Sequence, residues 1–133
     1  MSQENVEIVK AAFEAWNRRD WDAAVKDSAP GAEFDVSRAY GPYRGVYRLD
    51  QWRQLIEDFS STFESARIEA REFIDAGDHI LVPVTTYTRG RDGIEATAGG
   101  SYLWTIHDGA VVRVCLYQED QRHEAVEAAG LPE

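Results

Sequence analysis

Apolar residues recur at helical spacing in two long stretches of the chain. In the first, one helical face carries Val6, Val9, Phe13 and Trp16. In the second, which Asp50 is placed to cap, one face carries Trp52, Leu55, Ile56, Phe59 and Phe63. Between them, Asp20 is a good N-cap for a short helix over 21–25. We therefore expect three amphipathic helices before residue 64, each with an apolar face to bury.

From residue 64 the period of the pattern changes from helical to two, which is typical of β-strands. Turns rich in Asp, Gly or Arg separate the strands predicted over 67–74, 79–88, 94–106 and 110–118. An earlier strand is predicted over 32–36, and a last helix ends at Gly130, just before Pro132. This order indicates a single α+β domain over residues 1–133, in which the four later strands form an antiparallel meander.

The segment 107–109, His-Asp-Gly, suits a three-residue hairpin loop. Such a loop pairs Ile106 with Ala110 and Trp104 with Val112, and directly opposed residues share a face of the sheet. Both faces of this hairpin are then substantially apolar. Because three helices cover only one face, we expect a homodimer that packs through the convex face of the sheet. The alternative is an apolar but exposed convex face, which invites aggregation.

Composition narrows the class of partner. Asp and Glu total 24 against 14 Lys and Arg, a net charge of -10, which disfavours nucleic acid and anionic membranes as partners. The first residues lack the apolar run of a signal peptide, so we expect a cytoplasmic protein. Cys115 falls within a predicted strand and is interpreted as a buried thiol. The three histidines share no face or metal-ligand spacing, so we expect neither a metal nor a cofactor.

Five segments follow one another along the chain: "VEIVKAAFEAWNRRDWDA", "YRG", "EFIDAGDHILV", "LWTIHDGAVVRV" and "EAAGL". Together they resemble the SnoaL-like branch of the nuclear-transport-factor-two-like superfamily. The resemblance implies a cone of curved, mostly antiparallel sheet. Its N-terminal helices and mid-chain helix cover the concave face and enclose a pocket. The superfamily includes polyketide cyclases, ketosteroid isomerases, limonene-epoxide hydrolases, dehydratases and members that only bind or scaffold, so it implies a fold rather than one activity.

The same resemblance implies a ligand pocket against the concave face. That face is expected to hold Phe34, Val36, Pro83, Thr85, Tyr87, Tyr102, Trp104, Val114, Leu116 and Gln118. With the helices and the loop before residue 49, the expected ligand contacts are Trp16, Phe34, Val36, Trp52, Phe59, Thr85, Trp104, Val114, Leu116, Gln118 and Arg44.

The usual carboxylates of the family are missing from their expected positions. The base of the ketosteroid isomerases falls on Val36, and the acid/base aspartate of the cyclases falls on Leu116. The second carboxyl group of the isomerases falls on Tyr102, which can still donate a hydrogen bond to a carbonyl or enolate. The carboxylate–arginine set of the epoxide hydrolases falls on Thr85, Tyr87 and Leu116 and is absent.

Tyr102 and Tyr87 are therefore the candidate catalytic hydrogen-bond donors. A buried phenol needs a partner, and the partner is either a ligand oxygen or, in a core tyrosine, the backbone. Asp35 is a reserve candidate for a general base. It enters the pocket only if the strand register slips by one residue, which exchanges the two faces.

The segment Ser37–Arg48 gathers three arginines and three tyrosines into a loop broken by glycine and proline. Near a pocket mouth, Arg44 and its neighbours suit the grip of an anionic or polar ligand end. The other interpretations are a solvated connection and a salt bridge with the terminal helix.

Two functions remain open at this point. One is a cofactor-independent isomerase, cyclase or dehydratase that uses acid–base chemistry on a small, mostly apolar, oxygen-bearing molecule. The other is a non-catalytic ligand-binding or dimeric scaffold module of the same fold. The missing carboxylates favour the second function.

Overall fold

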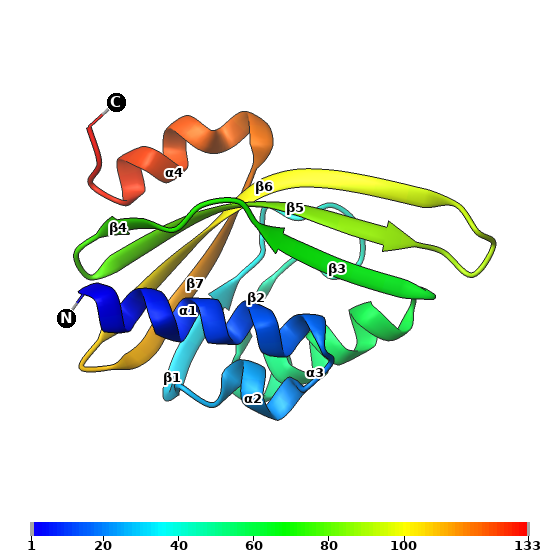
Figure 1. The fold of residues 1–133 in the computed structure, drawn as a ribbon, viewed down its shortest axis with the longest axis horizontal. Helices are drawn as coiled ribbons and strands as arrows, with labels where there is room; N and C mark the ends of the chain where they lie inside the picture. Colours follow the sequence, from blue (N-terminus) through cyan, green and yellow to red (C-terminus); the bar gives the residue numbers. More distant parts are fainter. Residues whose placement is uncertain (1, 133) are drawn as a thin grey trace.

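The computed structural model describes residues 2–132. Its elements, in chain order (Figure 1), are α1 (Ser2–Asn17), α2 (Trp21–Val25), β1 (Ser28–Asp35), β2 (Val46–Arg48), α3 (Leu49–Ser61), β3 (Ser65–Ala70), β4 (Ile74–Ala76), β5 (His79–Arg89), β6 (Glu95–His107), β7 (Ala110–Gln118), the 3₁₀ turn η1 (Glu119–Gln121) and α4 (Arg122–Ala128). None of the helices in the described range is long and apolar enough to cross a bilayer.

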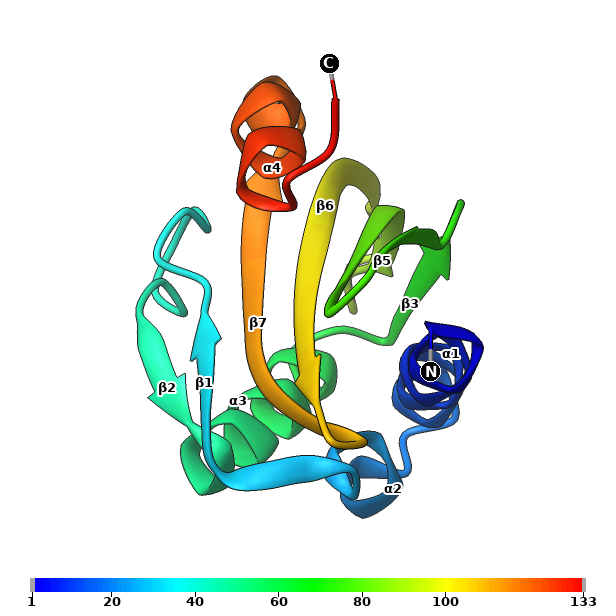
Figure 2. The same cartoon turned by 90° about the vertical axis from the view of Figure 1, so that its left-hand side faces the viewer.

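The strands form one sheet in the order β2-β1-β7-β6-β5-β3, with β4 paired to β5 beside β3. The predicted antiparallel meander is confirmed in β3, β5, β6 and β7. The early strand, β1, runs parallel to β7 and antiparallel to the short β2, which the sequence pattern did not indicate. The sheet curves strongly (Figure 2), and α1, α2 and α3 lie on its concave side. The expected α+β cone is therefore confirmed.

The main core fills the space between the concave face and the helices. Val9 and Phe13 of α1 are buried against Ile80 and Val82 of β5, as the helical stripe predicted. Burying each of these side chains stabilises the fold by about 1.5–3 kcal/mol. This packing fixes α1 over the β3–β5 side of the sheet.

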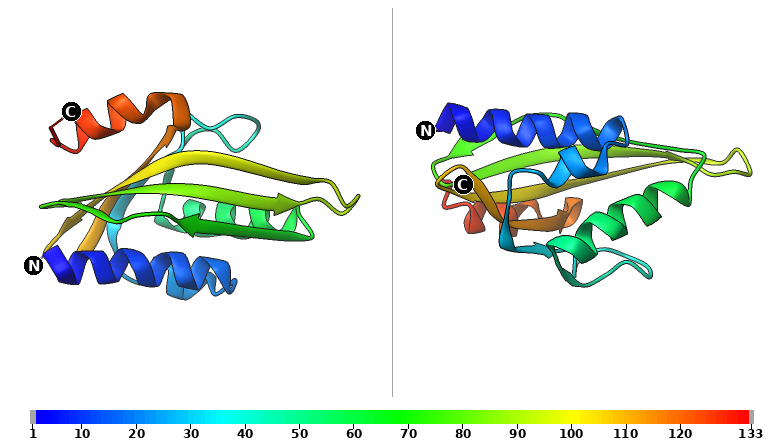
Figure 3. Two further views of the ribbon diagram at one scale, coloured as in Figure 1. Left: turned by 45° about the horizontal axis from the view of Figure 1, so that its top comes forward. Right: turned by 90° about the horizontal axis from the view of Figure 1, so that it is seen from below.

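The convex face carries a second core under α4, which lies across the sheet from α1 (Figure 3). Ala125 of α4 and its C-cap residue, Ala129, are buried against Leu81, Leu103 and Tyr117. The sequence argument covered one face with three helices and left this face to a second subunit. It gave the predicted terminal helix no covering role, and that step is wrong, because this helix folds back and covers part of the convex face.

The β6–β7 hairpin differs from its predicted register. Trp104 pairs with Val114, not Val112, and Tyr102 pairs with Leu116. The loop has two residues, Asp108 and Gly109, both with positive φ (50° and 77°), and a register shift follows between Thr105 and Ile106. The predicted pairing is thus wrong by one position at Ile106 and by two positions from Thr105 onward along the paired strands. An even shift preserves the faces, so Tyr102 and Trp104 remain concave.

The faces of β5 are the reverse of the prediction. Val82 pairs with Tyr102, and Thr86 pairs with Ala98, so the even-numbered residues of β5 face the concave side. Thr85 and Tyr87 therefore lie on the convex side, and their predicted concave placement is wrong. The run from Ile80 to Val84 is buried throughout, so its sequence shows no alternation from which the faces could be assigned.

The predicted helix ends are partly confirmed. The Asp20 carboxylate accepts from the backbone N–H of Ala23 (3.2 Å), as expected of an N-cap. Gly130 has φ +74° and follows the C-terminus of α4, as predicted. Asp50 does not cap α3, because the helix begins one residue earlier and the side chain of Gln51 accepts from the backbone N–H of Arg48 (3.0 Å).

Candidate functional site

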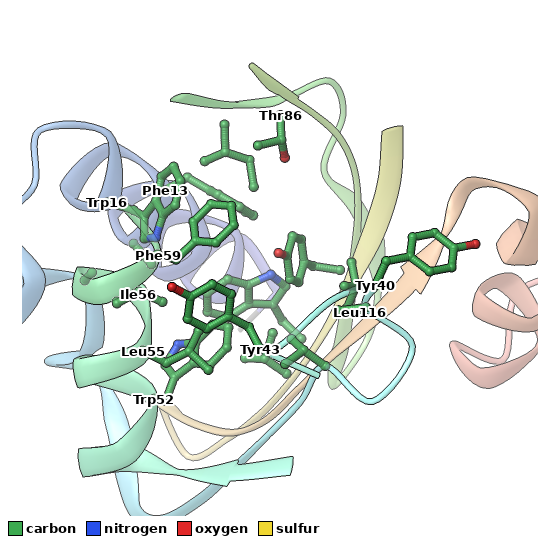
Figure 4. Close-up of a pocket in the computed structure, with 18 residues that line it drawn as sticks. Phe13, Trp16, Tyr40, Tyr43, Trp52, Leu55, Ile56, Phe59, Thr86 and Leu116 are labelled. Carbon is green, nitrogen blue, oxygen red and sulfur yellow. The ribbon is translucent and has the colours of Figure 1, made fainter. Parts of the chain in front are cut away.

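A cavity of about 210 Å³ lies between the helices and the concave sheet (Figure 4). Helices α1 and α3 contribute Ala12, Phe13, Trp16, Trp52, Leu55, Ile56 and Phe59. Strands β3, β5, β6 and β7 contribute Ile68, Thr86, Tyr102, Trp104, Val114 and Leu116. The rest of the wall is Ala24, Val36, Ala39, Tyr40 and Tyr43. The wall is therefore mostly aliphatic and aromatic.

Many of the residues expected to contact a ligand come together here. Of the expected ligand contacts, those in the cavity wall are Trp16, Val36, Trp52, Phe59, Trp104, Val114 and Leu116. Of the three catalytic candidates, only Tyr102 is in the wall. Its ring meets Phe13 of α1 edge-on, with 6.2 Å between the ring centroids. The Trp104 ring meets the same phenylalanine at 5.5 Å, so α1 and β6 form one continuous aromatic wall.

Four expected contacts lie outside the cavity wall. Phe34 is buried one layer behind it, stacked on Trp52 with 5.1 Å between centroids. The hydroxyl of Thr85 accepts from Arg71 Nη1 on the convex side (2.8 Å). The side-chain amide of Gln118 donates to the carbonyl oxygen of Arg38 (2.8 Å), and Arg44 is exposed. Gln118 thus holds the loop in place instead of contacting the cavity.

Tyr87, a catalytic candidate, lies on the convex face. The guanidinium of Arg67 stacks over its ring, 4.4 Å from the centroid. This contact accounts for the aromatic ring without a ligand. The prediction that Tyr87 faces the pocket is therefore wrong.

Asp35, the reserve base, also points away from the cavity. Its carboxylate accepts from the Ser37 hydroxyl (2.6 Å) and from Arg113 Nη2 (3.0 Å). Partial burial alone would raise the pKa of Asp35, but the hydrogen bonds from Ser37 and the Arg113 charge outweigh it and lower the pKa. A paired carboxylate on the wrong face cannot serve as base in this cavity, so that role is excluded.

The loop between β1 and β2 contributes Tyr43 to the cavity wall, whereas the Tyr40 side chain is largely exposed and the arginines contact other groups or solvent. Arg38 lies over the Tyr117 ring (4.4 Å), donates to the Cys115 sulfur (3.3 Å) and approaches Glu124 of α4 (3.7 Å). Arg48 Nη1 donates to the carbonyl oxygen of Gly31 (3.0 Å). Of the interpretations weighed from the sequence, the salt bridge to the terminal helix is the one present.

The sequence had indicated some wall residues only as members of an apolar stripe. Phe13, Leu55 and Ile56 belong to the helical faces that were expected to be buried, and part of each face lines the cavity. Tyr43 comes from the aromatic loop and is held by a hydrogen bond between its hydroxyl and that of Thr62 (3.2 Å). Thr86 was missed because the faces of β5 were reversed.

The chemistry available at the cavity is that of hydrogen-bond donors. None of the wall residues is Asp, Glu, His, Lys or Arg. Burial raises the pKa of Tyr102 to about 12, so its phenol keeps its proton at neutral pH and acts as a donor. The indole Nε1 of Trp104 is buried and has no acceptor within the described chain. The described residues also hold no cluster of three or more potential metal ligands.

A family model described as the SnoaL-like domain matches residues 9–114, most of the chain. The chain belongs to the SnoaL-like family. The match runs from α1 to the middle of β7 and includes every residue of the cavity wall except Leu116. Among curated proteins, none matches the sequence.

Solved structures share the fold over nearly the whole chain. TerC, co-crystallized with polyporic acid, is 23% identical with a TM-score of 0.75, over 93% of this chain and 98% of TerC. An NTF2-like protein of unknown function from Burkholderia pseudomallei is 23% identical with a TM-score of 0.76, over 93% and 95% of the two chains. A candidate polyketide cyclase from Xanthomonas campestris is 21% identical with a TM-score of 0.72, over 93% and 96%. At these identities the likeness establishes the fold alone.

Proposed function

We propose that this protein binds a small, mostly apolar, oxygen-bearing molecule in the cavity between α1, α3 and the concave sheet. The observation that carries the proposal is an aromatic cavity whose wall has no charged side chain and in which Tyr102 offers a hydroxyl. Apolar walls supply affinity, and a few polar groups fix the orientation of the ligand. The co-crystal of TerC with polyporic acid, an organic molecule, supports small-molecule binding in this fold.

Any catalysis in this cavity is restricted to hydrogen-bond activation. Isomerisation, cyclisation or dehydration needs a group that accepts a proton, and the wall offers no carboxylate or imidazole for that purpose. The phenol of Tyr102 can polarise a carbonyl group and stabilise an enolate by donating to its oxygen. A cofactor-independent reaction on such a substrate would therefore need the substrate or water to accept the proton.

The absence of a base among the wall residues favours the second candidate, a binding module without catalysis. The two candidates share the site and the ligand class, and they differ only in turnover. A third possibility is a scaffold that binds no ligand. A scaffold does not require an aromatic cavity, so the cavity argues against it.

Native mass spectrometry of gently purified protein tests this proposal. We expect mass in excess of the denatured polypeptide, and fragmentation of the excess mass identifies the ligand. The substitution Tyr102→Phe should lower the fraction of protein that retains ligand, because one hydrogen-bond donor to the ligand is lost. The apolar walls remain, so some ligand should still bind. The protein is also incubated with an organic-solvent extract of the cells in which it is expressed. If it carries no ligand after purification and takes up none from this extract, the scaffold is favoured instead.

A further inference from the structure

We propose that the cavity selects an uncharged ring ligand, of one or two fused rings, that carries a hydrogen-bond acceptor such as an aryl ketone. This inference rests on the proposed function and adds the polarity and the charge of the ligand. It follows from three properties of the wall: the polar atoms it presents, the charges it lacks and the volume it encloses.

The wall offers donors in excess of acceptors. Its indole side chains, Trp16, Trp52 and Trp104, have an N–H group that can donate and no atom that can accept. The Tyr102 hydroxyl is without a hydrogen bond within the described residues, whereas the Tyr43 hydroxyl is already engaged by Thr62. No Asn, Gln, Asp or Glu lines the cavity to accept from a ligand. A ligand that satisfies this wall therefore brings acceptors.

The wall also lacks any charge to pair with an ionised ligand. Arg38, Arg53 and Arg113, each within two residues of a wall residue, are engaged by groups outside the cavity. Arg44, next to Tyr43, is exposed to solvent. A carboxylate buried without a partner loses its hydration with little return. Aromatic walls attract quaternary ammonium groups, which makes a cation the competing class. The Tyr102 hydroxyl in the wall favours the neutral acceptor, because a quaternary ammonium cation cannot accept a hydrogen bond from it.

The size and shape of the cavity suit a small ring system. An engineered protein cavity of about 150 Å³ lined by apolar residues binds benzene. The cavity here is larger, about 210 Å³, and admits a second fused ring or a substituent. Phe13 comes from α1, and Trp52 and Phe59 come from α3 (Figure 4). A flat ring in this space can therefore contact aromatic side chains from both helices.

Calorimetric titration of the whole protein with four probes of similar size tests the inference. The probes are 1-indanone (neutral acceptor), indane (the same rings without oxygen), indane-1-carboxylate (anion) and trimethylanilinium (cation). We expect 1-indanone to bind about five- to tenfold more tightly than indane, which corresponds to one neutral hydrogen bond. The carboxylate should bind roughly 100-fold more weakly than the ketone. Indane binding as tightly as 1-indanone, or trimethylanilinium binding more tightly, would overturn the inference.

Two variants locate the donor. Tyr102→Phe should bring the affinity ratio of 1-indanone to indane close to one and leave the affinity for indane nearly unchanged. Tyr87→Phe makes the same chemical change on the convex face and should preserve the wild-type ratio. An unchanged ratio in Tyr102→Phe would reject Tyr102 as the selecting donor. The proposed function fails separately, if none of the four probes binds at millimolar concentration; equal binding of ketone and hydrocarbon overturns only the selectivity.

Discussion

Tyr102 is the one catalytic candidate from the sequence that lines the cavity. Its concave placement follows from strand alternation, and an error of two positions in the hairpin register does not change the face. Tyr87 failed the same argument, because β5 is buried on both faces near its start and its pattern does not identify the concave side. Strand alternation assigns a residue to a face but does not show whether its side chain reaches the cavity. Phe34 is on the concave face but lies beneath Trp52. Asp35 is on the other face, where it pairs with Arg113.

The pKa of Tyr102 predicts how stability depends on alkaline pH. Burial raises this pKa from 10.0 to about 12. In this range the unfolded chain releases its phenol proton first, so the native state binds more protons and the free energy of unfolding falls as pH rises. The loss begins near pH 10, is complete near pH 12 and amounts to at most about 3 kcal/mol.

Urea unfolding at several pH values between 9 and 12 measures this loss. Tyr102→Phe removes the titrating phenol. The difference in the free energy of unfolding between wild type and variant therefore isolates the contribution of Tyr102 from that of the other titratable side chains. We expect the free energy of unfolding of the wild type to fall relative to that of the variant as the pH rises. A difference that stays constant across the range would show that the phenol is not shielded from water.

At the scale of elements, the contact between β6 and β7 depends on Gly100, and the adjacent Gly99 provides a matched control. A Cβ atom on Gly100 would lie 2.9 Å from the backbone carbonyl oxygen of Tyr117, which the sheet holds in place. A Cβ atom on Gly99 would meet only the carboxylate end of the Glu119 side chain, which is exposed and can rotate away. The two adjacent positions thus make different demands for glycine.

We predict that Gly100→Ala lowers the free energy of unfolding by about 1–3 kcal/mol, because the backbone of β6 or β7 must shift. Gly99→Ala should change it by no more than about 0.5 kcal/mol. Chemical denaturation of both variants measures the contrast. Equal losses in the two would indicate that lost chain flexibility, or the Glu119 side chain, matters more than the Tyr117 carbonyl.

The elements themselves were largely predictable, and their exact pairing was not. Helical stripes and the change of period at residue 64 located α1, α3 and the meander. The irregularity that follows the hairpin turn leaves no mark in the sequence, because Val111 and Val112 are both apolar and either suits the concave core. The parallel pairing of β1 with β7 joins segments far apart in the chain, for which local patterns carry no information.

At the scale of the whole molecule, the convex face is the surface that was predicted to form a homodimer interface. Helix α4 covers the apolar part over Leu81, Leu103 and Tyr117. The remaining part, over β3 and β5, is polar, with Arg67 on the Tyr87 ring and Arg71 bonded to Thr85. An apolar interface is therefore no longer required, and the homodimer stays a prediction for the polar part alone.

We expect this dimer to weaken with salt, because a surface with exposed arginines associates through charge as much as through apolar contact. Light scattering at micromolar concentration, in low and high salt, measures the mass. The expected result is a dimer at low salt and a smaller average mass at high salt, with Arg71→Glu weakening association at low salt. A monomer mass under all conditions would reject the dimer.

The aromatic wall also gives the protein a built-in optical reporter. Three of its four tryptophans, Trp16, Trp52 and Trp104, line the cavity, and the ring of the fourth, Trp21, lies 6.3 Å from that of Trp16. Any molecule that enters the cavity changes the surroundings of most of the emitting groups in the chain. The intrinsic fluorescence of the unlabelled protein therefore registers occupancy directly, and candidate ligands can be screened by their effect on its intensity and wavelength.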